Sequence, residues 1–443
     1  MTGVRTYNRR NFLASVSATA AFTVIPRHVL GMPGVPAAND RLQIAGIGVG
    51  GIGSLDIQRV PTEQLVAICD VDSRQAAAAA KPFPDAKLYA DYREMLATRP
   101  DIDAVMIAAP DHQHAMISVH AMRLGKHVFC QKPLTHSVHE ALTVAQVAKE
   151  TGVATQMGNQ FQADEPARLI CEYIWSGAIG AVREVHSWSN RRPDISRRGV
   201  ARPTETPPVP AELNWDQWIG PAPMRPYHPS YHPFNWRSWW DFGTGVLGDI
   251  GCHNLSAVFK ALQLGWPESV EACSTHWPAP PEVRNESSPL ASIVTYRFAA
   301  TERHPDLVLK WYDGGMMPPM PKGIDIPNLF IDDGTLIVGD EGMLLGAKLL
   351  PESKAKAVGA PPRKLERSPG HYQEWVNACK GGAPAGSNFV DHAAHLAAVI
   401  LMGNIAIRTE EKMYWDAEQL KFKNSEAGNA LLNPPYRDGW KLG

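Results

Sequence analysis

Lys132 lies in the segment HVFCQKPLTH, residues 127–136, directly after an apolar run that is typical of a buried strand. Residues 137–152, which follow, have the pattern of a helix. In an open parallel sheet, ligands bind at the edge where the strands end, so a lysine at this place can face a substrate. Its ammonium group could donate to a reacting oxygen and stabilise negative charge there. Most lysines are simply solvated, and the position alone leaves that interpretation open.

Asp249 and His253 form a second candidate set, in the segment GTGVLGDIGCHN, residues 243–254. Their spacing of four places both on one face of a helix, about one turn apart. An imidazole beside a carboxylate can keep a defined tautomer and move a proton near neutral pH. The alternative is an aspartate near a helix start and a buried structural histidine, and the spacing alone favours that alternative.

A glycine pattern, G-x-G-x-x-G, is formed by Gly48, Gly50 and Gly53 between a predicted strand and a predicted helix. The first glycine permits a tight turn, the second lets a diphosphate approach the backbone, and the third lets helix and strand pack closely. Asp70 ends the next strand, where a carboxylate can bind a ribose 2′-hydroxyl and repel a 2′-phosphate. The pattern therefore favours NAD over NADP, although Arg74 lies close enough to weaken that preference. A glycine-rich turn without a nucleotide is the alternative.

The elements that must position these residues differ between the two parts of the chain. Continuous apolar runs alternate with helix patterns over residues 39–160, which predicts a Rossmann domain with a doubly wound parallel sheet. We expect residues 161–443 to form an α+β domain with a mostly antiparallel open sheet. Within it, residues 191–240 form a long loop rich in Pro and aromatic residues, typical of a binding loop or lid. Trp236, Trp239, Trp240, Tyr227 and Tyr231 could face a sugar ring, or could pack the loop against itself.

Composition excludes some classes of partner. The 443 residues contain 43 Lys and Arg and 45 Asp and Glu, a formal net charge of −2, which argues against nucleic acid or an anionic membrane surface. Six scattered cysteines without a C-x-x-C pair predict buried thiols, with neither a disulfide framework nor a metal site. After Asp40 we expect no apolar run of membrane-spanning length, and therefore no membrane insertion.

Residues 1–38 have the pattern of a twin-arginine export signal. Arg9 and Arg10 precede Phe12, Leu13 and a mildly apolar stretch, and a small-residue cleavage site lies near Ala37. We therefore expect a periplasmic or secreted protein. The alternative is a disordered basic N-terminus.

Together these motifs resemble the Gfo/Idh/MocA family of oxidoreductases. The resemblance rests on GIGVGGIG, on AAPDHQHA (residues 108–115), on CQKPLTH and on GDIGCHN. It implies NAD as the cofactor, a sugar or glycoside as the substrate, hydride transfer at a carbinol carbon, and a homo-oligomer. By the same resemblance, Lys132 bonds the reacting oxygen, His253 takes or returns the hydroxyl proton, and Asp249 orients His253.

The motifs and the resemblance also give two groups of expected contact residues. On the cofactor side these are Gly48, Gly50, Gly51, Ile52, Gly53, Asp70, Ala109, Pro110, His114, Gln131 and Lys132. On the substrate side they are Asn159, Gln160, Arg237, Trp240 and His253.

Gln131 departs from the family pattern, which has glutamate before the lysine. Without an anion beside it, Lys132 is expected to hold its proton less firmly, and neutral drift is the alternative explanation.

The function also has alternatives. Free NAD is scarce outside the cytoplasm, so a retained cofactor could serve exchange between two sugars. It could instead serve transient oxidation in an NAD-dependent glycoside hydrolase or lyase. A non-catalytic sugar-binding protein is a further alternative, which the set of Lys132, Asp249 and His253 disfavours.

Overall fold

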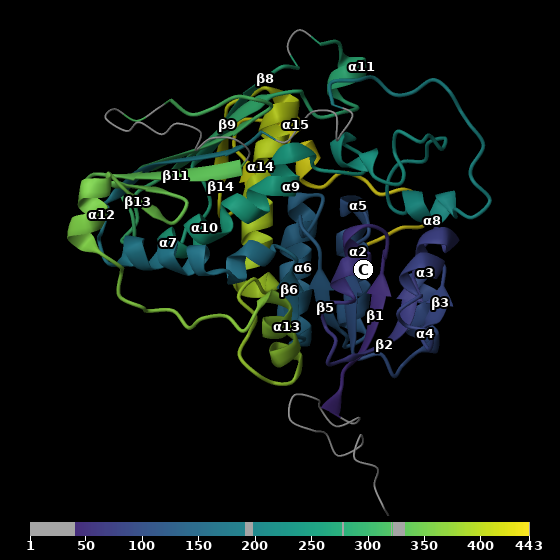
Figure 1. Ribbon diagram of the computed structural model, residues 1–443. Coiled ribbons are helices and arrows are strands. Elements are labelled where there is room, and N and C mark those ends of the chain that lie inside the picture. The colour runs from purple at the N-terminus through teal and green to yellow at the C-terminus, as the bar shows by residue number, and fades with distance from the viewer. Residues whose placement is uncertain (1–39, 191–197, 277–278, 320, 322–332, 443) are drawn as a thin grey trace, which may run out of the picture.

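The computed structural model describes residues 40–190, 198–276, 279–319, 321 and 333–442. The predicted export signal lies outside these residues, as does the start of the aromatic loop at 191–197. Two domains lie side by side, one built from the N-terminal elements in purple and blue and the other mainly from the green and yellow elements (Figure 1).

The first domain is built on a six-stranded sheet in the order β3-β2-β1-β4-β5-β6, with every neighbouring pair parallel. Its strands are β1 (Gln43–Ile47), β2 (Gln64–Cys69), β3 (Lys87–Tyr89), β4 (Ala104–Ile107), β5 (His127–Cys130) and β6 (Thr155–Met157). Its helices are α2 (Ile52–Asp56), α3 (Ser73–Ala79), α4 (Tyr92–Thr98), α5 (Asp111–Arg123) and α6 (Val138–Thr151). This strand order confirms the predicted doubly wound Rossmann sheet.

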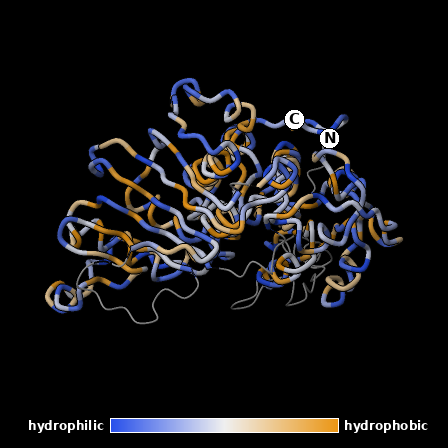
Figure 2. The backbone as a smooth tube through the Cα atoms, turned by 90° about the horizontal axis from the view of Figure 1, so that it is seen from above, coloured by the Kyte–Doolittle hydropathy of each residue, from blue (hydrophilic) through white to orange (hydrophobic). Residues whose placement is uncertain are grey.

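Local sequence explains where these elements begin and end. All four residues of β4 are buried, as expected for a central strand covered by helices on both faces. A capping box formed by Ser137 and Glu140 starts α6, and Gly152 ends it in the left-handed conformation. The hydrophobic stretches follow the strands and the helices between the sheets, whereas the outer loops are hydrophilic (Figure 2).

The second domain is built on a nine-stranded sheet in the order β13-β12-β11-β7-β10-β9-β8-β14-β15. Its strands are β7 (Val182–Ser189), β8 (Ser269–Ser274), β9 (Ser292–Phe298), β10 (Leu307–Asp313), β11 (Asp333–Gly339), β12 (Met343–Leu345), β13 (Lys348–Leu350), β14 (Met413–Asp416) and β15 (Lys421–Phe422). The pair β7 and β10 is parallel, and the other pairs are antiparallel, which confirms a mostly antiparallel sheet.

Helices of the second domain gather on one face of this sheet (Figure 1). They include α7 (Glu165–Trp175), α9 (Gly245–Asn254), α10 (Ser256–Leu262) and α14 (Ala394–Thr409). Shorter elements are α8 (Trp215–Ile219), α11 (Pro281–Arg284), α12 (Glu352–Val358), α13 (His371–Cys379), α15 (Glu426–Leu432) and the turns η2 (Gln160–Ala163), η4 (Asn235–Ser238) and η5 (Phe389–Ala393).

The continuous helix Phe389–Thr409 is long and apolar enough, by length and composition alone, to cross a membrane. The sequence prediction of no such run after Asp40 missed it. In the structure 78% of its most apolar window is buried, and α14 packs between α6 of the first domain and α9 and β8 of the second. It is therefore the central core helix that joins the two domains.

The predicted boundary at residue 160 needs one correction, because α13 packs back onto the first domain. Tyr372 stacks on Phe129 of β5 at 5.2 Å between ring centroids, and Trp375 is fully buried in the same apolar cluster. This return of the chain depends on contacts between residues that lie more than 200 positions apart in the sequence, and sequence periodicity does not reveal such contacts.

The described part of the aromatic loop packs mainly against itself. Trp215, Trp218, Tyr231, Trp236 and Trp239 lie in one buried cluster. The self-packing alternative therefore holds for these rings, and the sugar-facing interpretation is wrong for Tyr231 and Trp239, which are almost wholly buried. Of the six cysteines, all free, Cys273 is exposed and so departs from the predicted buried thiols.

Candidate active site

The glycine loop between β1 and α2 has the close backbone packing that its pattern predicts. Gly48 has φ +73°, and a Cβ atom on it would lie 2.5 Å from the backbone nitrogen of Ala109. A Cβ atom on Gly53 would lie 2.0 Å from the carbonyl oxygen of Gly48. The loop can therefore approach both β4 and its own helix only because these positions lack side chains.

A cavity of about 400 Å³ lies above this loop. Seven residues predicted to contact the cofactor line it: Gly48, Gly50, Gly51, Ile52, Asp70, Ala109 and Pro110. The glycine cradle, the carboxylate of Asp70 and the apolar walls fit the adenosine and diphosphate portion of a dinucleotide. Gly53 is buried beneath the loop, in agreement with its packing role.

Asp70 is held by the loop that it faces. Its Oδ2 accepts from the Val49 backbone N–H at 2.8 Å, and its Oδ1 accepts from that of Asp72 at 2.9 Å. Burial raises the pKa of Asp70 to about 6. A carboxylate can accept about four hydrogen bonds, so Asp70 keeps acceptor capacity for a ribose hydroxyl.

Arg74, which weakened the preference for NAD, is directed elsewhere. Its Nε and Nη2 donate to both carboxylate oxygens of Asp72, at 2.9 and 2.6 Å. This bidentate contact holds the pKa of Asp72 down at about 2. With Arg74 committed in this way, Asp70 remains the group that faces the cavity.

Lys132 and Asp249 form an ion pair between the two domains. Lys132 follows β5, whereas Asp249 lies in α9, and both side chains are about one-fifth exposed. Lys132 therefore has an anionic partner, and the expectation drawn from Gln131, that no anion lies beside this lysine, is wrong. The partner comes from a segment 117 residues away.

Gln131 and His114 do not face the cofactor cavity. Gln131 is buried and donates from Nε2 to Oδ2 of Asp56 at 2.7 Å. Tyr372 donates to the other oxygen of Asp56 at 2.7 Å, and burial raises the pKa of this carboxyl. Both ring nitrogens of His114 lie 2.7 Å from carbonyl oxygens, those of Pro133 and Ala109. Both residues therefore help to position the turn that carries Lys132, and their contact with the cofactor stays a prediction.

His253 lies one helical turn beyond Asp249 in α9, as its spacing predicts. Its ring is 4.9 Å from that of Phe161, measured between centroids, and Phe161 is 60% exposed. Phe161 was missed in the sequence, although it directly follows the predicted pair Asn159 and Gln160. An exposed aromatic face beside the candidate proton-transfer group is a ready contact for a ring-shaped substrate.

The remaining predicted substrate residues make hydrogen bonds within the chain, and their contact with the substrate stays a prediction. Asn159 is fully buried and donates to the carbonyl oxygen of Cys252 and to Ser256, so it fixes the end of α9. Gln160 donates to the hydroxyl of Tyr372 at 3.2 Å. Trp240 is buried and donates from Nε1 to the carbonyl oxygen of Arg284. Arg237 lines the cofactor cavity, and its contact with the substrate stays a prediction.

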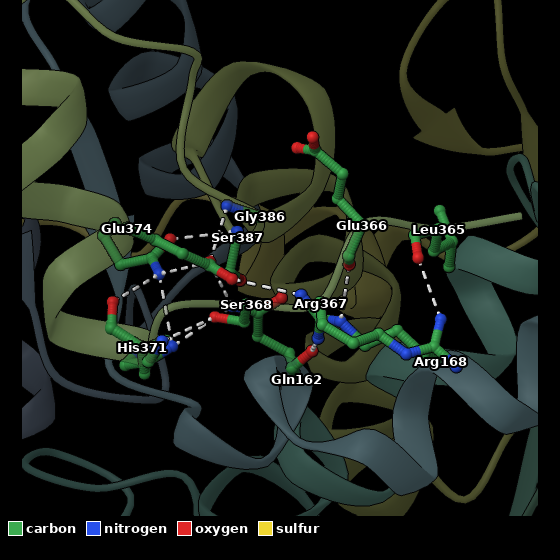
Figure 3. A network of polar contacts seen from close by, with 12 residues as sticks. Gln162, Arg168, Leu365, Glu366, Arg367, Ser368, His371, Glu374, Gly386 and Ser387 are labelled. Carbon is green, nitrogen blue, oxygen red and sulfur yellow. Dashed lines mark hydrogen bonds and ion pairs between the residues drawn. The ribbon is translucent and has the colours of Figure 1, made fainter. Parts of the chain in front are cut away.

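A polar network supports η2, the turn that carries Phe161 (Figure 3). Gln162 donates to Glu374 of α13 at 2.9 Å, and Arg168 of α7 donates to the same carboxylate at 3.1 Å. Arg168 also donates to the carbonyl oxygens of Gln162 and Glu366. The network ties η2 to α7 and α13 and so fixes the position of η2.

Comparison with protein families gives matches in both domains. Residues 42–159 match the Gfo/Idh/MocA model "Oxidoreductase family, NAD-binding Rossmann fold". Residues 199–272 match the model of that family's "C-terminal alpha/beta domain". Two stretches of the chain therefore match models of the Gfo/Idh/MocA family. These matches support the resemblance drawn from the motifs, and the glycine loop and Asp70 lie in the stretch that matches an NAD-binding Rossmann fold.

Curated relatives of the chain include two inositol 2-dehydrogenases. That of Burkholderia multivorans is 31% identical over 184 residues, which cover 40% of this chain and 54% of the relative. That of Rubrobacter xylanophilus is 32% identical over 163 residues, covering 35% and 46% respectively. The chain thus spans about half the length of the curated relatives it matches.

Solved structures show the same two-domain fold. The WlbA dehydrogenase of Bordetella pertussis, in complex with NADH and UDP-GlcNAcA, has a TM-score of 0.58 at 15% identity, covering 85% of this chain and 99% of that one. A levoglucosan dehydrogenase in complex with NADH and levoglucosan has a TM-score of 0.55 at 19% identity, covering 85% and 99%. Within the described ranges, no group of three His, Cys, Asp or Glu side chains could hold a metal ion.

Proposed function

We propose that the protein is an NAD-dependent oxidoreductase that acts on a carbinol carbon of a sugar or glycoside. One observation carries the proposal: Lys132, at the sheet edge that also bears the glycine-loop cavity, pairs with Asp249 of the other domain, and His253 lies one turn further along the same helix. When bound, NAD supplies the acceptor or donor of a hydride. The residues of this chain supply binding, orientation and proton transfer.

Lys132 is assigned to the reacting oxygen of the substrate. Its ammonium group can donate to that oxygen and stabilise the charge that develops there. The ion pair with Asp249 orients the ammonium group and leaves it further N–H donors. Asp249 is a positioning residue in this role.

His253 is assigned to the hydroxyl proton. It lies on the same face of α9 as Asp249, so both groups can reach one substrate carbinol. The neutral ring accepts the proton when the alcohol is oxidised and returns it in the reverse direction.

The sugar class is supported by two kinds of observation. The exposed ring of Phe161 offers an apolar face beside His253, which suits the apolar side of a sugar ring. Relatives and fold neighbours include dehydrogenases of inositol and levoglucosan, both polyhydroxylated rings.

The twin-arginine signal proposed for residues 1–38 would deliver the protein to a compartment poor in free NAD. We therefore propose that the cofactor is retained through turnover. Retention is compatible with sugar-to-sugar exchange and with transient oxidation during glycoside cleavage.

The first test is the ultraviolet spectrum of cofactor released by denaturing protein purified without added NAD. We expect near-stoichiometric NAD(H), followed by a change in nicotinamide absorbance when inositols, hexoses and glycosides are supplied. Protein that contains no NAD, does not bind added NAD and shows no absorbance change with any of these compounds would contradict the proposal.

A further inference from the structure

Part of the second domain lies across the cofactor cavity of the first. Besides the residues of the Rossmann domain, the cavity of about 400 Å³ is lined by seven residues of the aromatic loop. These are Gln217, Trp218, His232, Pro233, Phe234, Trp236 and Arg237. The adenosine side of the cavity is therefore walled by both domains.

Backbone and side-chain bonds hold this loop on the Rossmann domain. The N–H of Asn214 donates to the carbonyl oxygen of Val71 at 2.8 Å, and that of Ser73 donates to the carbonyl oxygen of Glu212 at 3.0 Å. Gln113 of α5 donates to the carbonyl oxygen of Trp218 at 2.8 Å. These bonds join the loop to the β2–α3 connection and to α5, so the loop has a defined position on the Rossmann domain.

The positive charge of Arg237 distinguishes it from the other residues of the loop that line the cavity. Among the described residues that line the cavity, it is the only one with a permanently positive side chain. The glycine loop supplies backbone N–H groups but no cationic side chain, whereas a dinucleotide carries a doubly negative diphosphate at that place. A guanidinium group, with its planar fork of donors, is well suited to bind phosphate oxygens.

Neighbouring residues of the same loop hold the guanidinium group of Arg237 in place. It lies over the ring of Phe234 at 4.2 Å and over that of Trp236 at 4.4 Å, and Nη1 donates to the carbonyl oxygen of Phe234 at 2.9 Å. Because one Nη donor is used in this way, the rest of the donor fork is available to a ligand.

We propose that Arg237 binds the diphosphate of NAD, so that the second domain supplies the cationic ligand that the glycine loop lacks. The inference rests on the proposed function, in which NAD is the cofactor. It explains how the cofactor is retained: release requires the diphosphate to leave Arg237 and the loop to lose its bonds to Val71, Ser73 and Gln113.

The test compares two ligands that differ only by the diphosphate, ADP and adenosine, by calorimetric titration of cofactor-stripped full-length protein. In Arg237→Gln we expect the Kd for ADP to rise about 10- to 100-fold, since a charge-assisted contact is lost. The Kd for adenosine should change less than twofold. Arg237→Lys, which keeps the charge, should fall between Arg237→Gln and the wild type.

Arg202→Gln is the matched control, because Arg202 belongs to the same loop but pairs with Glu286 and does not line the cavity. It should leave both affinities unchanged. Wild-type binding of ADP should also weaken with added salt more steeply than that of the Arg237→Gln protein.

An unchanged Kd for ADP in Arg237→Gln would overturn the inference, and so would an equal loss for ADP and adenosine. Either result leaves the proposed function standing, provided that the wild type binds NAD. A wild-type protein that binds neither NAD nor ADP would overturn both the inference and the proposed function.

Discussion

Lys132 and Asp249 form an ion pair although 117 residues separate them in the chain and they belong to different domains. Lys132 is fixed by the turn after β5, which His114 holds through the carbonyl oxygen of Pro133. Asp249 is fixed by α9, whose end is held by Asn159 of the first domain. The geometry of the candidate site therefore depends on how rigidly the two domains are joined.

Replacing Lys132 tests whether this pair acts on the substrate. We expect Lys132→Met to lower kcat about 10²- to 10³-fold, the usual effect of removing one donor to a charged oxygen. Asp249→Asn should cost less, and the double variant should cost little more than Lys132→Met alone because the two residues act as a unit. The measurement is initial-rate kinetics with the best substrate. Lys149→Met, at an exposed position of α6, is the control. A kcat for Lys132→Met within twofold of the wild type would refute the role of Lys132 at the reacting oxygen.

His253 should control the pH dependence of the reaction. We expect His253→Ala to lower kcat about 10²- to 10⁴-fold and to remove the limb of the pH–rate profile that reports its ionisation. NAD binding should be unaffected, because His253 does not line the cofactor cavity. His139→Ala, an exposed histidine of α6, is the control. A rate that falls with the shape of the profile unchanged would indicate a structural role instead.

Gln131→Glu should destabilise the fold in a way that depends on pH. The new carboxyl group would face buried Asp56, whose pKa burial already raises, and it would lose the N–H group that Gln131 donates. The two carboxyl groups would share a proton in the folded state at a pH where the unfolded chain has released it. Stability therefore falls as pH rises, and we expect a loss of about 2–4 kcal/mol at pH 8 and a smaller loss at pH 5.

Thermal or urea unfolding at both pH values measures this effect. Gln58→Glu introduces the same charge at an exposed position of the first domain and should change stability little at either pH. An equal loss for Gln131→Glu at pH 5 and pH 8 would show that the substitution acts by packing rather than by charge.

Local sequence was enough to predict the parallel sheet and its ligand-binding edge. The apolar run Ala104–Ile107 and the glycines around Gly48 carry that information within a few residues. The partner of Lys132 and the place of Arg237 could not be predicted in the same way. Both depend on packing between segments more than 100 residues apart, for which periodicity gives no register.

Residue type alone does not say whether a polar side chain faces a ligand or bonds within the chain. Asn159 and Gln131 are of types common in binding sites, yet both are buried and bonded to the chain itself. Phe161 shows the opposite case, because an apolar residue predicted for no role is 60% exposed beside His253. Solvent exposure of the side chain distinguishes these cases. It depends on the folded chain, so the sequence alone could not supply it.

Phe161 should contribute to substrate binding without taking part in the chemistry. We expect Phe161→Ala to raise KM about 3- to 10-fold, because one ring-stacking contact with the substrate is lost, while kcat changes less than twofold. Phe161→Tyr should remain close to wild type, since it keeps the aromatic face. Tyr414→Ala, which removes an exposed ring from β14, is the matched control and should change neither constant. A kcat that falls as far as KM rises would mean that Phe161 positions His253 instead of contacting the substrate.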